Sequence, residues 1–293
     1  MKIFDCTIFL DEKMIFDLRL NLLNKYVDKF VVVESLYTHA GNKKKQNFDI
    51  NDFKKFKDKI IYILIENEPD GLLDISGKFS EGNKRLNSAK RIKLQYNTLA
   101  QGIQTADDND LILLSDCDEI PNLAEIDKNV KNEIIIFKQN LYYFKFDYLY
   151  NGIQWYGSKG CKKKKLKTFE WLRYVKNKKY DFWRIDTLFS DKKYQNIRFV
   201  NNGGWHFTNI KNPKDIVYKL SNFGEHNEFE TTGMSEEDFK KCIENGELLY
   251  DHSADKKASA KEKVSKKVKL EKNSTNLPDF LLNNKDRYKE WFS

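Results

Sequence analysis

The sequence predicts an α/β fold, a single Rossmann-type domain around a mostly parallel central sheet. The chain opens with alternating strand, helix and strand patterns, the order typical of such a sheet. Residues 111–114 are wholly apolar, as expected of a strand buried on both faces. The 293 residues suffice for one large domain with a tail. We place this domain at residues 1–250 and a basic, helical C-terminal extension at residues 251–293.

The first half of the chain supplies the parallel strands. Periodicity predicts strands at residues 2–10, 29–35, 60–65 and 110–114. Apolar residues at helical spacing predict helices at residues 16–25 and 84–104. Between them, residues 66–83 are rich in Gly, Pro, Asp and Ser, which favours a loop.

The second half is more mixed. Strands are predicted at residues 133–139 and 141–149, with another ending near Val200 and a loop at 152–160. Helices are predicted at residues 213–223 and 235–245, the latter capped by Ser235. The lysine-rich tail at 260–272 has helical propensity but a narrow apolar stripe, which favours a solvated helix. A membrane-surface or polyanion contact is the alternative.

Charge and cysteine usage restrict the class of protein. Lys and Arg number 52 against 44 Asp and Glu, with the excess concentrated at residues 162–165 and 256–272. The four cysteines are far apart and show no CxxC pair, so neither a zinc site nor a disulfide framework is indicated. No run approaches the ~20 apolar residues of a membrane span. We therefore expect a cytoplasmic protein, with peripheral membrane contact through the basic tail as the alternative.

An acidic cluster follows the apolar strand in LILLSDCDEIP, residues 111–121. In an extended backbone residues i and i+2 share a face, so Asp116 and Asp118 are predicted to converge on one cation. Their hard oxygen ligands suit Mg²⁺ or Mn²⁺, which bridges diphosphate oxygens. The alternative is a turn cap before Pro121. We favour the metal site because neighbouring carboxylates repel one another unless a cation or a helix N-terminus relieves them.

A second informative segment is NNGGWHFTNI, residues 201–210. Gly203 and Gly204 permit a tight turn or a close backbone approach. His206 follows a Trp at the end of a predicted strand, which makes it a candidate third metal ligand. A core histidine bonded to the backbone is the alternative.

Together these segments resemble glycosyltransferase family 17, which includes the β-1,4-N-acetylglucosaminyltransferase that adds the bisecting residue to N-glycans. The resemblance runs from Phe4 to about Tyr250, through IFDCTIFLDE, VVVESLYTHAG, LILLSDCDEIP, WYGSK, GGWHF and IVYKLSNFGEH. It implies a GT-A-like fold, a divalent metal and inversion at the anomeric carbon. It also implies a UDP-sugar donor, UDP-N-acetylglucosamine, and a glycan acceptor, which we expect to be a surface polysaccharide.

The resemblance assigns roles around the donor. Asp116 and Asp118 become ligands of the metal and the diphosphate, beside Ser115, and His206 resembles the late histidine that completes the metal site. Glu34 ends a predicted strand where a carboxylate can bind the ribose or base; its alternative role is a charge that ends the strand. The family pattern has an Arg where this chain reads Gln95, Tyr96, Asn97, so Arg91, one turn earlier, is the predicted replacement.

Inversion needs a general base that deprotonates the acceptor hydroxyl. Several acids after the acidic cluster remain candidates, and we favour Asp186 and Glu228. Aromatic and polar residues of the WYGSK and GGWHF segments are expected to contact the acceptor. The candidate bases are Asp147, Glu170, Asp186, Glu225 and Glu228, and the acceptor residues are Trp155, Ser158 and Trp205.

Two other functions compete with this one. A metal-dependent nucleotidyl- or phosphotransferase would also use paired aspartates, but no phosphate-binding G-x-x-x-x-G-K-[ST] loop is present. A non-catalytic basic protein that binds glycan or RNA would explain the net charge of +8. It would leave the acidic cluster without a purpose, and those carboxylates would repel nucleic acid. Nucleic acid is therefore not an expected partner.

Overall fold

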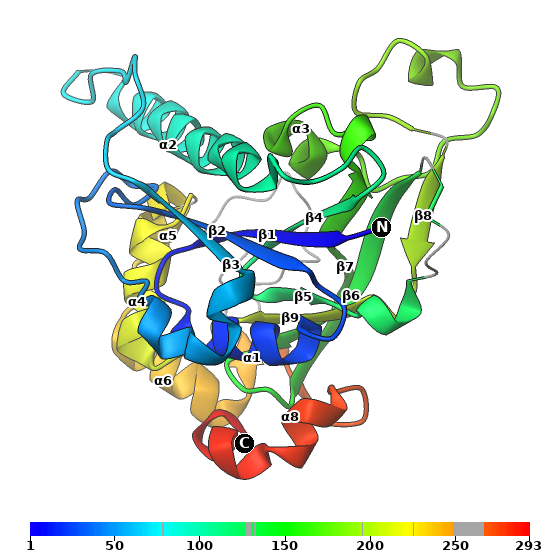
Figure 1. Ribbon diagram of the computed structural model, residues 1–293. Helices are drawn as coiled ribbons and strands as arrows, with labels where there is room; N and C mark the ends of the chain where they lie inside the picture. The colour runs from blue at the N-terminus through cyan, green and yellow to red at the C-terminus, as the bar shows by residue number, and fades with distance from the viewer. Residues whose placement is uncertain (78, 127–129, 132, 195, 225, 249–266) are drawn as a thin grey trace.

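The computed structural model describes residues 1–77, 79–126, 130–131, 133–194, 196–224, 226–248 and 267–293. Within them the chain forms an α/β fold around one curled sheet, with helices on both sides (Figure 1). The strand order is β3-β2-β1-β4-β7-β6-β9-β5, with β8 beside β6 and β12 beside β7. The strands are β1 (Ile3–Phe9), β2 (Lys29–Ser35), β3 (Ile60–Ile65), β4 (Leu111–Asp116), β5 (Glu119–Pro121), β6 (Ile134–Tyr143), β7 (Tyr148–Lys162), β8 (Ile197–Val200), β9 (Gly204–Thr208) and β12 (Glu271–Lys272), while β10 (Glu247–Leu248) pairs with β11 (Val268–Lys269) separately.

The helices cover the sheet on both faces. Among them, α1 lies on one side of the β1–β4 region, and α2 and α3 lie on the other (Figure 1). The helices are α1 (Lys13–Leu23), α2 (Ser80–Thr98), α3 (Phe169–Tyr174), α4 (Pro213–Asn222), α5 (His226–Thr232), α6 (Glu236–Asn245) and α8 (Asp279–Asn283), with 3-10 turns η1 (Ile50–Lys59), η2 (Leu99–Ile103), η3 (Leu123–Glu125), η4 (Lys163–Lys165), η5 (Ile185–Thr187) and η6 (Lys285–Trp291).

The first four strands are parallel, as the sequence predicts. β1 lies between β2 and β4, and β3 pairs with β2. Alternate residues of β2 enter different cores because successive side chains of a strand point to opposite faces. Phe30 and Val32 pack on the α1 side, and Val31 and Val33 pack on the α2 side. The mostly parallel α/β prediction is thus confirmed here, while β7 introduces antiparallel pairs with β4 and β6.

The prediction for residues 133–160 is wrong in two places. The two predicted strands at 133–139 and 141–149 are largely one strand, β6, and the predicted loop at 152–160 lies inside β7. Glycines suggested that loop, but they allow close packing instead. A side chain at Gly157 would collide with Gln139, and one at Gly160 would collide with Leu113.

The predicted helices at 213–223 and 235–245 are confirmed as α4 and α6. Ser235 forms a capping box with Asp238 at the start of α6. The predicted helix at 84–104 begins earlier, at Ser80, and its last turn is the 3-10 turn η2. None of the helices that the structure describes is long and apolar enough to cross a bilayer.

The described part of the predicted C-terminal extension packs on the sheet. Residues 249–266, which include much of the predicted basic helix, lie outside the described residues. Residues 268–272 form the short strands β11 and β12 rather than a helix, because their backbones pair with β10 and β7. Farther on, Leu281, Tyr288 and Phe292 are buried in the same core as Phe146.

A buried ion pair links α1 to β1. Arg19 and Asp5 are fully buried, and the guanidinium donates two hydrogen bonds to the carboxylate, at 2.7 Å from Nε and 2.6 Å from Nη2. The Nη1 atom of Arg19 reaches three backbone oxygens of the segment after β4, those of Asp116 (3.3 Å), Cys117 (3.4 Å) and Glu119 (2.7 Å). Arg19 therefore fixes the path of the acidic cluster.

We expect Asp5→Asn to lower the free energy of unfolding by about 3–5 kcal/mol, because it leaves the Arg19 charge buried without a counter-ion. Urea denaturation measures this change. The matched control is Asp52→Asn, which breaks the exposed pair with Lys13 and should cost less than about 1 kcal/mol. Equal effects of the two substitutions would contradict the role given to Arg19.

Candidate functional site

A cavity of about 270 Å³ lies at the carboxyl ends of β1, β2 and β4. β1 and β4 are neighbours although the chain runs from β1 outward to β2 and β3 first. Such a switch point is where open α/β sheets bind ligands. Among the residues that line this cavity are Glu12, His39, Asp116, Asp118, Trp155, Arg173, His206 and Lys219.

The acidic cluster reaches the cavity through a turn. β4 ends at Asp116, and Cys117 and Asp118 form a turn before β5 begins at Glu119. The expectation that Asp116 and Asp118 share one face of an extended strand is therefore wrong. Both still line the cavity, but their carboxylates have different partners.

Asp116 faces α2 and α3. Its Oδ1 accepts hydrogen bonds from the hydroxyl of Tyr96 at 2.6 Å and from Nη1 of Arg173 at 2.9 Å. Nη2 of Arg173 lies 2.8 Å from the other carboxylate oxygen, so the contact is bidentate. The Arg173 guanidinium also lies 5.2 Å from the centre of the Tyr96 ring. Arg173 thus provides, beside the cavity, the positive charge expected from Arg91.

Asp118 faces α4 and β9. Its Oδ2 accepts a hydrogen bond from the Lys219 ammonium at 2.8 Å, and its Oδ1 lies 3.5 Å from Nε2 of His206. Burial alone would raise the pKa of the Asp118 carboxyl, but Lys219 and His206 hold that pKa far below its usual range. Burial alone would lower the pKa of Lys219, but Asp118 and Glu12 raise it above its usual range. The pair therefore stays ionised.

His206 is held by the paired glycines and by two neighbours. Gly204 has a φ of +111° and no room for a Cβ against Ile120, which supports the predicted close backbone approach. β9 then pairs with β5, so His206 lies opposite Glu119. The ring of Trp155 lies 4.5 Å from that of His206, and its indole N–H donates to Glu119 at 2.9 Å. The Nδ1 atom of His206 is buried without a hydrogen-bond partner.

The residues that line the cavity fit a divalent cation only in part. Among the described residues, no three His, Cys, Asp or Glu side chains cluster closely enough to hold a metal by themselves. Asp118 and His206 present an oxygen and a nitrogen to the same space, whereas Asp116 is held by Arg173 and Tyr96. Magnesium is commonly bound by one or two carboxylates together with substrate phosphates.

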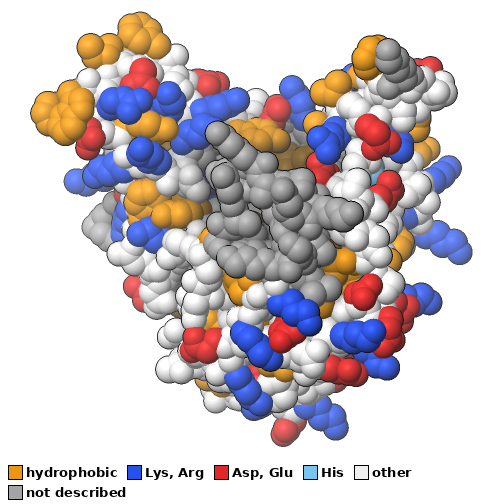
Figure 2. Space-filling model, turned by 180° about the vertical axis from the view of Figure 1, so that it is seen from behind, with side chains coloured by type: hydrophobic (Ala, Val, Ile, Leu, Met, Phe, Trp, Pro, Cys, Tyr) orange, Lys and Arg blue, Asp and Glu red, His pale blue; other side chains and the backbone are white. Residues whose placement is uncertain are grey.

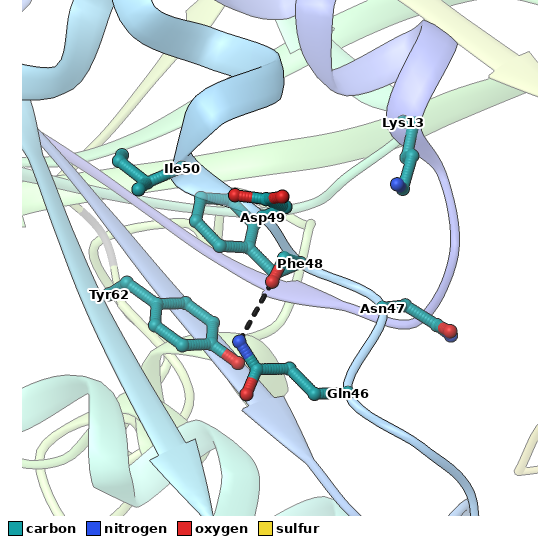
Figure 3. Close-up of a pocket in the computed structure, with 7 residues that line it drawn as sticks. All are labelled: Lys13, Gln46, Asn47, Phe48, Asp49, Ile50 and Tyr62. Atoms are coloured by element: carbon teal, nitrogen blue, oxygen red, sulfur yellow. Dashed lines mark hydrogen bonds between the residues drawn. The ribbon is translucent and has the colours of Figure 1, made fainter.

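Three of the five predicted donor-binding residues do not line the cavity, namely Glu34, Arg91 and Ser115. Glu34 has no exposed surface, and its carboxylate accepts hydrogen bonds from Lys44, Tyr62 and the backbone N–H groups of Asn47 and Phe48. It anchors the loop that forms a shallow hollow of about 470 Å³, in which Phe48 stacks on Tyr62 (Figure 3).

Arg91 also does not line the cavity that holds the acid pair. Its guanidinium forms a bidentate pair with Glu68, at 2.7 and 2.8 Å, and also donates to the backbone oxygen of His39 at 3.3 Å. It supports the loop that carries His39 into the cavity.

Ser115 and Ser158 are buried beneath the acidic cluster. The Ser115 hydroxyl donates to that of Ser158 at 2.7 Å, and Ser158 donates to the backbone oxygen of Glu119 at 3.1 Å. Of the three predicted acceptor residues, Trp155 alone lines the cavity. Trp205 packs against the core and donates its indole N–H to the backbone oxygen of Asn276.

None of the candidate bases that the structure describes lines the cavity. Asp186 is partly exposed and paired with Arg184 and Lys193, and Glu228 is paired with Arg85. Asp147 accepts hydrogen bonds from Ser293, and Glu170 pairs with Lys93. Glu225 lies outside the described residues.

Sequence reasoning missed four residues that line the cavity. Arg173 and Lys219 are isolated basic residues in the second half, and Glu12 and His39 lie in loops after β1 and β2. Burial lowers the pKa of His39 to about 4, so its imidazole is neutral near pH 7. The available signal was position: both His39 and Glu12 follow strands whose carboxyl ends meet at the switch point.

We expect Asp118→Asn to lower the free energy of unfolding by about 3–5 kcal/mol near neutral pH, because Lys219 then stays buried and unpaired. The double variant Asp118→Asn/Lys219→Met should recover most of this loss, because both charges are gone. Urea denaturation measures both changes. Because the folded state lowers the pKa of Asp118, its contribution is fully present above its unfolded pKa of ~3.9, declines below that pH, and is lost as the pH falls toward the much lower folded pKa. A difference that grows in acid would contradict this assignment.

Two comparisons with known proteins bear on the family of this chain. A search of curated proteins finds no match to this chain. The model of glycosyltransferase family 17 matches residues 1–292, nearly the whole chain, including β4, the acidic cluster and the strand that carries His206. Because the match covers far more than half of the chain, the protein belongs to glycosyltransferase family 17.

Proposed function

We propose that the protein transfers N-acetylglucosamine from UDP-N-acetylglucosamine to a glycan acceptor, with inversion and in a GT-A-like fold. One observation carries the proposal: the acidic cluster reaches a cavity at the β1/β4 switch point, beside two cationic side chains. Family membership supports sugar transfer. The choice of sugar, the inversion and the polysaccharide acceptor are supported by the family resemblance of the motifs.

The charged residues of the cavity suit a departing nucleoside diphosphate. Negative charge accumulates on that group as the glycosidic bond breaks, and fixed positive groups in a partly buried site stabilise it. Arg173 and Lys219 are such groups, each already oriented by an aspartate. Trp155, which also lines the cavity, offers an aromatic face to a sugar ring.

We propose Mn²⁺ or Mg²⁺ as the cofactor, held by Asp118 and His206 together with the donor phosphates. The support is the 3.5 Å separation of Asp118 Oδ1 and His206 Nε2 at the cavity. When bound, the ion would act as a Lewis acid toward the leaving diphosphate. Asp116, held by Arg173, would contribute to the same charge balance from the opposite wall.

We propose Glu12 as the general base. It lines the cavity, and among the described residues no ion pair involves its carboxylate. Burial raises the pKa of Glu12, and the neighbouring Asp11 raises it further, although Lys211 and Lys219 act in the opposite direction. A raised pKa makes a carboxylate a stronger base at the pH where the enzyme operates.

A panel of nucleotide sugars, tested with a polysaccharide acceptor in manganese and in EDTA, examines the donor and the metal separately. We expect turnover of UDP-N-acetylglucosamine in manganese and a loss of about 10²-fold or more in EDTA. Anomeric proton NMR of the product reports inversion. Full transfer in EDTA would reject the metal and leave Arg173 and Lys219 as the neutralising groups. If no nucleotide sugar binds or turns over, the donor proposal fails.

We expect Glu12→Gln to lower kcat by about 10²–10⁴-fold, with little change in donor affinity measured by calorimetry. Because Glu12 must be ionised to act, wild-type kcat/KM should fall as the pH drops below its raised pKa. That acidic limb should disappear in the variant. The control is Glu228→Gln, which lies outside the cavity and should keep wild-type rates and pH profile. An unchanged acidic limb in Glu12→Gln would exclude Glu12 as the base.

A further inference from the structure

A loop directly after α3 projects from the body of the molecule, and we call residues 176–192 the projecting segment (Figure 1). Its base is closed by a hydrogen bond from the Lys176 backbone N–H to the Lys192 backbone oxygen at 2.8 Å. The indole N–H of Trp171, in α3, donates to the backbone oxygen of Asp191. The segment is therefore anchored at its base, and its middle carries several exposed large apolar side chains.

The middle of the projecting segment is strongly apolar and exposed. Large apolar side chains normally avoid water, and contiguous exposed ones mark an interaction surface. Phe182 and Trp183 contact one another edge to face, with ring centres 4.9 Å apart. The exposed fractions are 83% for Phe182, 63% for Trp183, 67% for Ile185, 78% for Leu188 and 87% for Phe189.

Basic residues flank this apolar middle on both sides. Those before it are Lys176, Lys178 and Lys179, and those after it are Lys192 and, just beyond the segment, Lys193. Arg184 and Lys193 neutralise Asp186 within the loop. The arrangement is thus an apolar middle with positive charge at the base.

A second projection rises on the same side of the molecule. It is formed by the loop before α2 and the start of that helix, where Leu73, Ile75 and Phe79 are 38%, 50% and 75% exposed. Figure 2 shows hydrophobic side chains at the ends of both projections, with Lys and Arg side chains below them.

We propose that these two projections dock the protein on an anionic lipid bilayer, with the apolar side chains in the interfacial region. Trp and Phe favour the boundary between headgroups and acyl chains, and nearby Lys and Arg are attracted to anionic headgroups. The apolar residues lie at the middle of the projecting segment and the basic residues lie at its ends. In a bilayer, the acyl chains likewise lie deeper than the anionic headgroups, so each set of residues would meet its matching layer.

Charge complementarity favours an anionic bilayer over a second copy of the chain or a glycan as the partner of this surface. A second copy of this chain would bring the same basic residues against one another, because a two-fold contact pairs like patches. A glycan would bind aromatic faces but would leave Ile185 and Leu188 in water. An anionic bilayer satisfies the aliphatic, aromatic and basic residues together. The inference is independent of the donor and metal proposed above.

Vesicle co-sedimentation of the 293-residue chain tests the proposal. We expect binding to phosphatidylcholine vesicles that contain phosphatidylglycerol, weaker binding at high salt, and little binding to phosphatidylcholine alone. Trp183→Ser/Phe189→Ser should weaken binding about tenfold or more, because two apolar side chains no longer enter the interface. The matched control, Ile50→Ser/Leu282→Ser, removes exposed apolar residues elsewhere and should bind like wild type.

A second variant distinguishes weaker membrane binding from a folding defect in the first variant. Lys178→Glu/Lys179→Glu keeps every apolar residue and should also weaken binding to the anionic vesicles about tenfold or more. Circular dichroism checks the fold of each variant. Brominated lipids should quench the fluorescence of Trp183, so Trp183→Phe should bind with reduced quenching.

Several results would overturn the proposal. They are no wild-type binding to the anionic vesicles, equal binding by wild type and both double variants, or equal binding to neutral vesicles. Sedimentation velocity adds another test: a dimer that Trp183→Ser/Phe189→Ser abolishes, without vesicle binding, would assign the surface to contact between two copies.

Discussion

Arg19 carries a positive charge in the interior and links β1 and α1 to the turn after β4, which is about a hundred residues away in sequence. Its guanidinium is shared between the carboxylate of Asp5 in β1 and the backbone oxygens of the turn after β4. An isolated buried charge is very unfavourable, so the pair with Asp5 is needed for the cation to remain there. A lysine would not replace it, because the planar guanidinium spreads several donors over fixed directions. The geometry of the acidic turn depends on this contact.

The same turn shows how the protein relieves repulsion between neighbouring acids. Asp116 and Asp118 are matched by Arg173 and Lys219, which come from different helices. The two pairs hold the carboxylates against different elements instead of leaving them to converge. Burial of Asp118 and Lys219 makes their attraction stronger than it would be at the surface. Internal ion pairs thus relieve part of the carboxylate repulsion that the sequence analysis expected a metal to relieve.

The sequence predicted those elements that depend only on residues close to one another along the chain. The parallel strands β2 and β3 occupy the predicted residues because their apolar runs are bounded by polar ones. The cap at Ser235 was likewise readable from four consecutive residues. The cluster at 116–119 could be placed at the sheet edge because it follows a buried strand.

Features that depend on distant partners were not predicted. The glycines of β7 suggested a loop, whereas their role is set by Gln139 and Leu113 on neighbouring strands. Glu34 looked like a ligand residue because it ends a strand, yet donors from the following loop and from β3 occupy its carboxylate. Arg173 and Lys219 carry no local motif. Only the tertiary fold brings them to the acids.

The ion pairs of the cavity also determine what must accompany donor binding. Asp116 and Asp118 are balanced by Arg173 and Lys219 before any ligand enters. The proposed nucleoside diphosphate would add negative charge beside acids that are already paired, and in a partly buried space this imbalance is unfavourable. Binding of the proposed donor should therefore be linked to uptake of positive charge in the form of a cation. The affinity for the proposed donor would then depend on the ions around the protein, through binding as well as through chemistry.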